Sequence, residues 1–307
     1  MNMPRTILLA GISLSICVSA TNAVLITEKK EVKKTTETGE IHGARNIEID
    51  TGAATYLLRY SYQFDKAGKK IFDKYEGPFS GLGLGPNSAN WRLEGQGFFS
   101  AVVDGTQILC SELAEIKIMG QGRKGLVSIS WKHEKADVTL NIIALDKDDK
   151  LMFEVSLNPK GTIKSFELRF KCFPYYYFDV KDPEKKARDR WIATAKRKVQ
   201  HKADVELSPE EDWVYYYDTV IKTGGPAALM IRQGESAKIK LEVQDYCINT
   251  SISYPPEAQH VHFALWDFGQ GISWEEGLER MNGLAEKARE DLRKESFRQP
   301  QKIEIRE

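Results

Sequence analysis

Residues 138–157 read VTLNIIALDKDDKLMFEVSL, and this stretch decides the fold. Apolar side chains alternate with polar ones from Val138 to Ala144 and again from Leu151 to Leu157. A period of two is typical of a β-strand with one buried face. The residues between the two runs, 146–149, have the composition of a turn. The stretch therefore predicts two antiparallel strands, each with one face toward a core and one toward solvent.

The same alternation recurs along the rest of the chain. It is clearest over residues 56–64, 127–131, 166–172 and 238–243. Strands with one apolar face bury it when two sheets stack face to face. We therefore predict a mainly β fold, a large antiparallel two-sheet β-sandwich with one C-terminal amphipathic helix.

The helix is predicted at about residues 274–294. Ser273 is followed three residues later by Glu276, which matches a capping box at a helix start. Apolar residues then recur at helical spacing and form one stripe. They are Trp274, Leu278, Met281, Ala285, Ala288 and Leu292. The stripe predicts a helix that docks on a face or an edge of a sheet.

The N-terminus has the pattern of an export signal. Residues 1–23 combine Arg5, an apolar stretch too short to span a bilayer, and small residues before two candidate cleavage sites. We expect an exported protein, periplasmic or extracellular, with no transmembrane segment in the mature chain. Lipid anchoring through Cys17 is a less favoured alternative, because Ile16 precedes it where a small residue is wanted. Residues 24–45 are expected to form a polar leader, either mobile or as one loosely attached strand, and residues 46–307 a single large β-sandwich domain.

Charge and cysteine content narrow the class further. The sequence has 44 Lys and Arg and 44 Asp and Glu, so no overall field favours nucleic acid as a partner. Beyond the signal, three cysteines remain, Cys110, Cys172 and Cys247, which allow at most one disulfide within the chain. The protein is therefore not a disulfide scaffold despite its predicted export.

Sequence motifs for catalysis are absent. The chain has no Gly-x-Ser-x-Gly elbow and no Cys in an activated context. His260 and His262 share one face of a predicted strand, but no third metal ligand is assured, so we predict no metal and no cofactor. Catalytic residues stay unassigned, with His262 and Asp267 as the candidates, and whether the protein is an enzyme stays open.

Two aromatic blocks, residues 173–178 and 213–218, flank a basic segment at residues 181–202. In an extended chain, alternate rings point away from the core, and the apolar face of a sugar ring is one possible cover for them. Arginine can bind an acidic group through two hydrogen bonds. The candidate ligand-binding residues are Tyr175, Tyr177, Arg190, Trp191, Tyr215, Tyr217 and Trp266.

The basic segment also has a simpler explanation. Residues 204–218 carry six acids and no Lys or Arg. Opposite charges on adjacent strands stabilise their pairing, so the acidic stretch is predicted to neutralise the basic one. This interpretation is favoured over a site for an anionic ligand.

The amphipathic strands and the late Trp266-Asp267-Phe268 run resemble the large sandwich of galactose-mutarotase-like proteins of secreted bacterial carbohydrate metabolism. The resemblance is one of pattern and transfers no catalytic residue. It implies sugar chemistry, and three functions follow from it and from the aromatics. The first is carbohydrate binding without catalysis through surface aromatics. The second is a carbohydrate-active enzyme, an epimerase, lyase or hydrolase. The third is a structural or interaction protein of the cell envelope.

Overall fold

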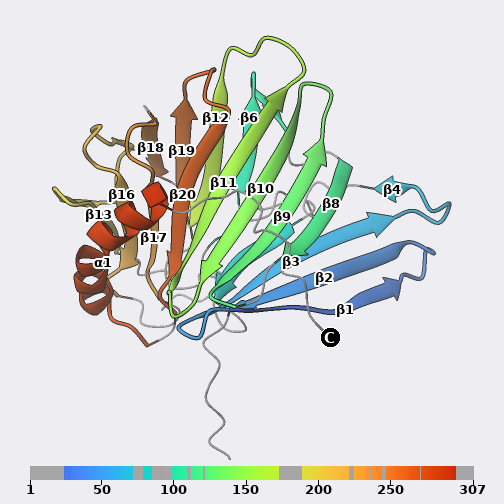
Figure 1. Ribbon diagram of the computed structural model, residues 1–307, viewed down its shortest axis with the longest axis horizontal. Helices are drawn as coiled ribbons and strands as arrows, with labels where there is room; N and C mark the ends of the chain where they lie inside the picture. Colours follow the sequence, from blue (N-terminus) through green and yellow to red (C-terminus); the bar gives the residue numbers. More distant parts are fainter. Residues whose placement is uncertain are drawn as a thin grey trace, which may run out of the picture.

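The alternating strands predicted from the sequence pair into three antiparallel sheets in the computed structural model (Figure 1). The structure describes residues 24–71, 79–84, 91, 99–108, 112–119, 122–172, 189–220, 225–235, 237–243, 247–269 and 271–294. The predicted signal peptide with Cys17, the candidate residues Tyr175 and Tyr177, and Cys110 lie outside these ranges.

The largest sheet has nine strands and contains the hairpin at 138–157. Its order is β14-β13-β16-β17-β20-β11-β10-β9-β8. The strands are β8 (Glu112–Met119), β9 (Lys124–Lys132), β10 (Ala136–Leu145), β11 (Lys150–Pro159), β13 (Arg190–Ala193), β14 (Lys198–Gln200), β16 (Trp213–Asp218), β17 (Ala227–Ile231) and β20 (His260–Asp267). In the hairpin, Val138 pairs with Leu157 and Ala144 with Leu151, so the predicted apolar faces coincide.

Two smaller sheets supply the facing layer. The six-stranded sheet has the order β15-β18-β19-β12-β6-β7, and the five-stranded sheet the order β1-β2-β3-β4 with β5 on β3. The first comprises β6 (Phe99–Val103), β7 (Thr106–Gln107), β12 (Phe166–Cys172), β15 (Val205–Glu206), β18 (Lys238–Val243) and β19 (Ile248–Tyr254). The second comprises β1 (Leu25–Thr35), β2 (Ile41–Asp50), β3 (Thr55–Phe64), β4 (Lys70–Ile71) and β5 (Phe79–Leu84).

One continuous core fills the space between the nine-stranded sheet and the two smaller sheets. The inward residues of β10, β11 and β20 belong to it together with those of β12, β19 and β3. Phe153 and Phe263 stack on neighbouring strands with their rings 4.8 Å apart, and Phe170 meets Phe263 from the opposite sheet. Both described cysteines, Cys172 and Cys247, are buried as free thiols. The predicted mainly β fold of large antiparallel sheets is confirmed.

The predicted helix is confirmed as α1 (Trp274–Lys294), and the Glu276 amide donates to the Ser273 hydroxyl at 3.1 Å. Its buried stripe packs on the outer face of the nine-stranded sheet, where it forms a second apolar layer with β16, β17 and β20. Figure 1 shows α1 beside β13, β16 and β17, at the end of the sheet opposite β8. In the part of the chain that the structure describes, no helix is long and apolar enough to cross a membrane.

The segment at residues 24–45, for which a mobile leader or one attached strand was expected, is part of a sheet. It forms β1 and the first part of β2, which pair along most of their length. Val24 and Ile26 are buried, and both contact the position of Gly125 on β9. Two apolar side chains on one face therefore anchor a strand whose other residues are mostly polar, and the backbone hydrogen bonds of the ladder hold the rest.

Candidate functional site

A polar groove lies on the outer face of the six-stranded sheet, over β12, β19 and β18. Residues directly opposite each other in an antiparallel pair point to the same side. The pairing registers therefore place three rows across this face, and every member except Lys238 lines the groove. They are Lys171–Asn249–Glu242, Arg169–Ser251–Lys240 and Glu167–Ser253–Lys238.

The shape of the groove follows from the sizes of these side chains. The central strand β19 presents the short side chains Asn249, Ser251 and Ser253, whereas both neighbouring strands present long Lys, Arg and Glu side chains. The floor is therefore low and the walls are high, and the cavity has a volume of about 490 Å³. Its lining residues are Gln107, Glu167, Arg169, Phe170, Lys171, Lys240, Glu242, Asn249, Thr250, Ser251 and Ser253.

The exposed charges of the groove are paired within it. The Arg169 guanidinium donates to the Glu167 carboxylate on the same strand. The Lys240 ammonium lies 2.9 Å from Glu242 and 3.2 Å from Asp204, and its hydrogen bonds to these two acids raise the pKa of Lys240. Lys171 is buried at 7% exposure. The groove therefore offers neutral hydrogen-bonding groups on its floor between walls whose exposed cations are paired with carboxylates.

The candidate aromatics of β16 and β20 lie elsewhere, on the outer face of the nine-stranded sheet. Alternation placed Tyr215 and Tyr217 away from the main core, and the structure agrees, since only Tyr216 of the triplet belongs to it. The expectation that the outward rings are exposed is wrong, because α1 covers them. Tyr215 and Tyr217 are 0% and 2% exposed, and Trp266 is buried beside them at 1%.

The contacts beneath α1 show what these rings do. The Tyr215 hydroxyl donates to the Trp274 carbonyl at 2.8 Å, and the Tyr217 ring stacks on the Trp274 ring with centroids 4.9 Å apart. The Trp266 indole donates to the Asp149 carboxylate at 3.2 Å. The tyrosines therefore hold the first turn of the helix.

The two ligand-binding candidates on β13, Arg190 and Trp191, lie on opposite faces of the strand. Trp191 is half-buried on the outer face, opposite Tyr217 on one side and Gln200 on the other. Arg190 is buried at 8% exposure and pairs in register with Asp218. Among the described candidates, Tyr215, Tyr217, Trp266 and Trp191 thus share one apolar cluster beneath α1, and Arg190 lies apart from it.

The acidic stretch pairs with two cations of the described part of the basic segment, Lys196 and Arg197. Lys196 pairs with Glu210 at 3.0 Å, and Arg197 holds Glu211 through two hydrogen bonds of 2.9 Å. Burial raises the pKa of Glu211, but the hydrogen bonds from Arg197 and Thr194 outweigh burial and bring this pKa to about 2.

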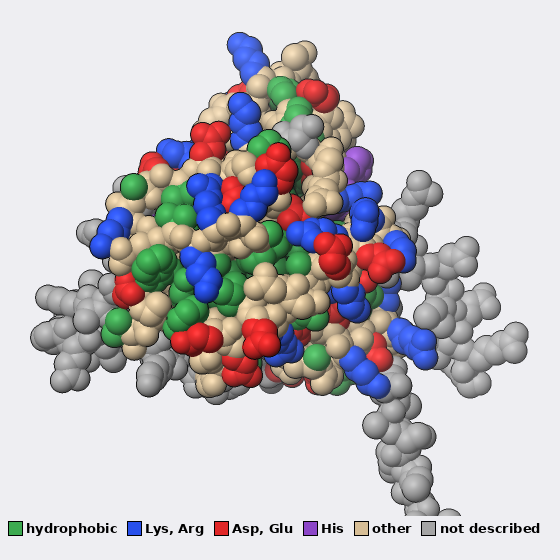
Figure 2. Space-filling view, turned by 90° about the vertical axis from the view of Figure 1, so that its left-hand side faces the viewer, with side chains coloured by type: hydrophobic (Ala, Val, Ile, Leu, Met, Phe, Trp, Pro, Cys, Tyr) green, Lys and Arg blue, Asp and Glu red, His purple; other side chains and the backbone are tan. Residues whose placement is uncertain are grey.

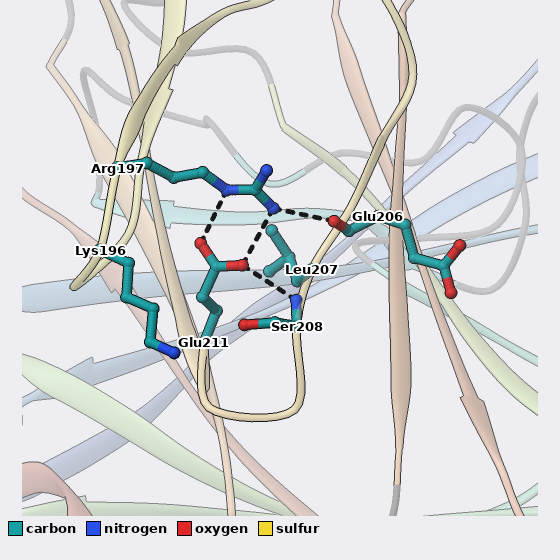
Figure 3. A pocket seen from close by; sticks show the side chains of 6 residues that line it. All are labelled: Lys196, Arg197, Glu206, Leu207, Ser208 and Glu211. Atoms are coloured by element: carbon teal, nitrogen blue, oxygen red, sulfur yellow. Dashed lines mark hydrogen bonds and ion pairs between the residues drawn. The ribbon is translucent and has the colours of Figure 1, made fainter.

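Figure 3 shows this cluster at a surface depression of about 540 Å³. Arg197 reaches from the β13–β14 turn to Glu211 and also donates to the Glu206 carbonyl at 2.8 Å. The Ser208 amide donates to the same Glu211 carboxylate at 2.9 Å. Because these groups satisfy one another, the cluster ties the 208–211 turn to the β13–β14 hairpin rather than presenting a free charge.

The catalytic candidates His262 and Asp267 occupy opposite faces of β20. His262 belongs to the outer face, whereas Asp267 is 3% exposed and its amide lies 3.3 Å from the Tyr56 hydroxyl below the sheet. The His262 ring lies between two carboxylates, 3.1 Å from Glu154 on β11 and 2.7 Å from Glu235 in the β17–β18 loop. The structure therefore gives His262 acidic partners that the sequence did not identify.

We expect the His262 cluster to make stability fall as the pH rises above neutrality. Burial lowers the pKa of His262, but its bonds to Glu154 and Glu235 outweigh burial and raise the pKa above its ordinary value. The charged ring thus contributes stability that is complete below about pH 6.5 and is lost as the pH rises through the folded-state pKa. Denaturant unfolding measured between about pH 6 and pH 9 should show a steeper loss in the wild type than in His262→Gln.

His260→Gln is the matched control for this experiment. His260 is exposed on the same strand face and contacts Ser156 at 3.0 Å. Its replacement should leave the wild-type slope in place. Equal slopes for the wild type and His262→Gln would contradict the assignment.

The sequence did contain a signal for the groove. Asn249, Ser251 and Ser253 alternate with the apolar side of β19, and they are short polar residues where the neighbouring strands carry long charged ones. The sequence analysis treated the polar sides of these strands as ordinary solvent faces. Only the order of strands, with β19 between β12 and β18, turns the short residues into a floor.

Metal ligands do not gather in the described ranges: no three His, Cys, Asp or Glu residues there are placed to hold an ion.

The surface on the side of the molecule that carries α1 has positive and negative side chains interspersed, with hydrophobic side chains exposed between them (Figure 2).

Comparison with known proteins finds similarity only among solved structures. No protein-family model matches the chain, and no curated protein matches it. A GH36 α-galactosidase from Geobacillus stearothermophilus is 11% identical, with a TM-score of 0.37 over 78% of this chain and 41% of its own. An α-mannosidase from Enterococcus faecalis is 10% identical, with a TM-score of 0.45 over 88% and 39%.

A third similar structure is a TPR-domain containing protein from Parabacteroides distasonis. It is 8% identical, with a TM-score of 0.41 over 80% of this chain and 55% of its own. This chain therefore spans about two fifths of the length of the two glycosidases and about half of the third protein.

Proposed function

We propose that the protein binds carbohydrate in the groove over β12, β19 and β18, without making or breaking a bond. The observation that carries the proposal is the groove itself, a cavity of about 490 Å³ with a floor of Asn249, Ser251 and Ser253. In agreement with its predicted signal at residues 1–23, we propose that the protein acts in the periplasm or outside the cell.

The floor has the chemistry that a polyhydroxylated ligand needs. A serine hydroxyl both donates and accepts a hydrogen bond, and the Asn249 amide offers two donors beside an acceptor oxygen. Sugar hydroxyls also donate and accept, so each floor residue can match one. Residues two apart on a strand repeat at about 6.8 Å, and the three floor residues therefore extend over about 14 Å. That length suits an oligosaccharide better than a single sugar.

Binding is favoured over glycoside hydrolysis by the state of the groove carboxylates. Hydrolysis requires one carboxylic acid that passes its proton to the leaving oxygen. Glu167 accepts from Arg169 and Glu242 accepts from Lys240, so both described carboxylates of the groove are engaged in ion pairs. Neither is placed as a free acid beside a second carboxylate.

The double substitution Asn249→Ala with Ser251→Ala tests the proposal. Each lost hydrogen bond is worth about 0.5–1.5 kcal/mol, so affinity for a glycan should fall by about 5- to 150-fold for the pair. A glycan array identifies a bound oligosaccharide, and titration calorimetry then measures both variants.

The control is Ser128→Ala with Ser130→Ala on the outer face of β9, where two partly buried serines share a strand face in the same way. This control should bind as the wild type does. The proposal fails if the wild type binds no glycan on the array, or if the groove variant keeps full affinity with an unchanged melting temperature.

A further inference from the structure

We infer that the groove selects uncharged saccharides and excludes chains that carry uronate or sulfate groups. This inference rests on the proposed function and adds the substrate class. The observation behind it is that the two exposed cations that line the groove, Arg169 and Lys240, already have carboxylate partners.

The first pair, Arg169 with Glu167, lies along one strand at positions two apart. The Arg169 side chain is 47% exposed and that of Glu167 is 24% exposed, so both reach the solvent side of the groove. A guanidinium recognises a carboxylate or sulfate through its paired donors. Here Glu167 takes up the Nε donor, and an incoming anion would also meet the negative charge of Glu167 beside it.

The second exposed cation, Lys240, has two carboxylate partners. Lys240 lies between Glu242 on its own strand and Asp204, which precedes β15, and these two acids outnumber the one ammonium group. An anionic ligand would have to displace one acid and would still face the other. The third cation, Lys171, is buried at the edge of the floor.

Hydrogen-bonding capacity, in contrast, remains available to a neutral ligand. Ser253 is exposed, and Asn249 and Ser251 are half-buried on the floor between the two charged walls. Ligand hydroxyls can reach these residues without separating an ion pair. The groove therefore disfavours anionic ligands because its exposed cations already bind carboxylates, and not because cations are missing.

The test compares oligogalacturonates with the neutral oligosaccharides obtained by reducing their carboxyl groups to hydroxymethyl groups, which keep the length and the linkage, together with sulfated forms of the neutral series. We expect the wild type to bind the neutral series with little dependence on salt and to bind the acidic series at least about tenfold more weakly. Glu167→Gln removes the partner of Arg169, so the ratio of its affinity for the acidic series to its affinity for the neutral series should rise about tenfold. Glu242→Gln should give a smaller gain, because Asp204 still holds Lys240.

Glu115→Gln on β8 is the matched control. Glu115 pairs with Lys117 at 2.7 Å, two positions away on one strand with both side chains 50% exposed, but outside the groove. It changes the net charge by the same amount and should leave acidic affinity unchanged. A gain in the control as large as in Glu167→Gln would overturn the inference in favour of a general charge effect.

The remaining outcomes separate the two proposals. The wild type could bind the acidic series more tightly than the neutral series, with an affinity that falls steeply as salt is added. This result would overturn the preference for neutral saccharides and leave carbohydrate binding intact. A failure to bind either series, with any other glycan on the array also unbound, would overturn the proposed function and the inference with it. Unchanged acidic affinity in a folded Glu167→Gln would overturn the role assigned to the ion pair.

Discussion

Replacing Arg289 with Met is expected to lower the free energy of unfolding by about 3–5 kcal/mol, the range for a buried ion pair that loses one partner. Arg289 on α1 donates from Nε and Nη2 to the two oxygens of Asp212, at 2.6 and 2.9 Å. The Asp212 side chain is 2% exposed, and these are the contacts that satisfy its carboxylate. Without the guanidinium, a charge stays buried at the point where the helix meets the start of β16. Denaturant unfolding of the two proteins measures the loss.

Two further variants make this prediction specific. Arg293→Met, one turn along the same helix, removes an exposed guanidinium whose Nε contacts the Arg289 carbonyl, and should change stability by no more than about 0.5 kcal/mol. Adding Asp212→Leu to Arg289→Met removes the stranded charge, so most of the lost stability should return. If the double variant is as unstable as Arg289→Met, the cost does not come from the unpaired carboxylate.

Gly277→Ala is expected to destabilise the protein by about 2 kcal/mol, although alanine is the better helix former by about 1 kcal/mol. Gly277 lies on the face of α1 that packs against the sheet. A Cβ there would overlap the Tyr215 hydroxyl and approach the Pro226 Cγ to 2.9 Å. To relieve the overlap, the helix must move outward or Tyr215 must give up its hydrogen bond to the Trp274 carbonyl. Thermal and denaturant unfolding report the change.

For Gly283 of the same helix, replacement by alanine is expected to increase stability. A Cβ at this position meets nothing within 4 Å, so Gly283→Ala should raise stability by up to about 1 kcal/mol. The two glycines therefore separate helix propensity from helix docking. Stabilisation by both substitutions would show that α1 does not approach β16 as closely as the structure places it.

Local sequence patterns were sufficient for several central strands and for the helix of this fold. The alternation from Val138 to Leu157 predicted β10 and β11, and their register is the one that its apolar faces require. The stripe from Trp274 to Leu292 and the Ser273 cap predicted α1 with its bounds. These features succeeded because period, capping and turn composition each depend on residues that are close in the chain.

The candidate site could not be predicted from such local patterns. The aromatic block around Tyr215 is as compatible with a ligand platform as with a docking face, and the outcome depended on a helix that begins 59 residues later. The groove depends on the pairing of β12 with β19 and of β19 with β18, and β12 and β19 are separated by about 80 residues. Neither the polar side of β12 nor that of β19 is unusual when it is read alone.

By itself, therefore, the sequence determined that the chain forms amphipathic strands and one helix, which face of each is apolar, and that the acids at 204–218 can neutralise the neighbouring cations. The tertiary structure alone decided which strands became neighbours, so that short side chains lie between long ones, and which outward face received a helix instead of a ligand. The physical reason is that the face a side chain takes is a property of the local backbone. What lies opposite that face depends on contacts between distant segments.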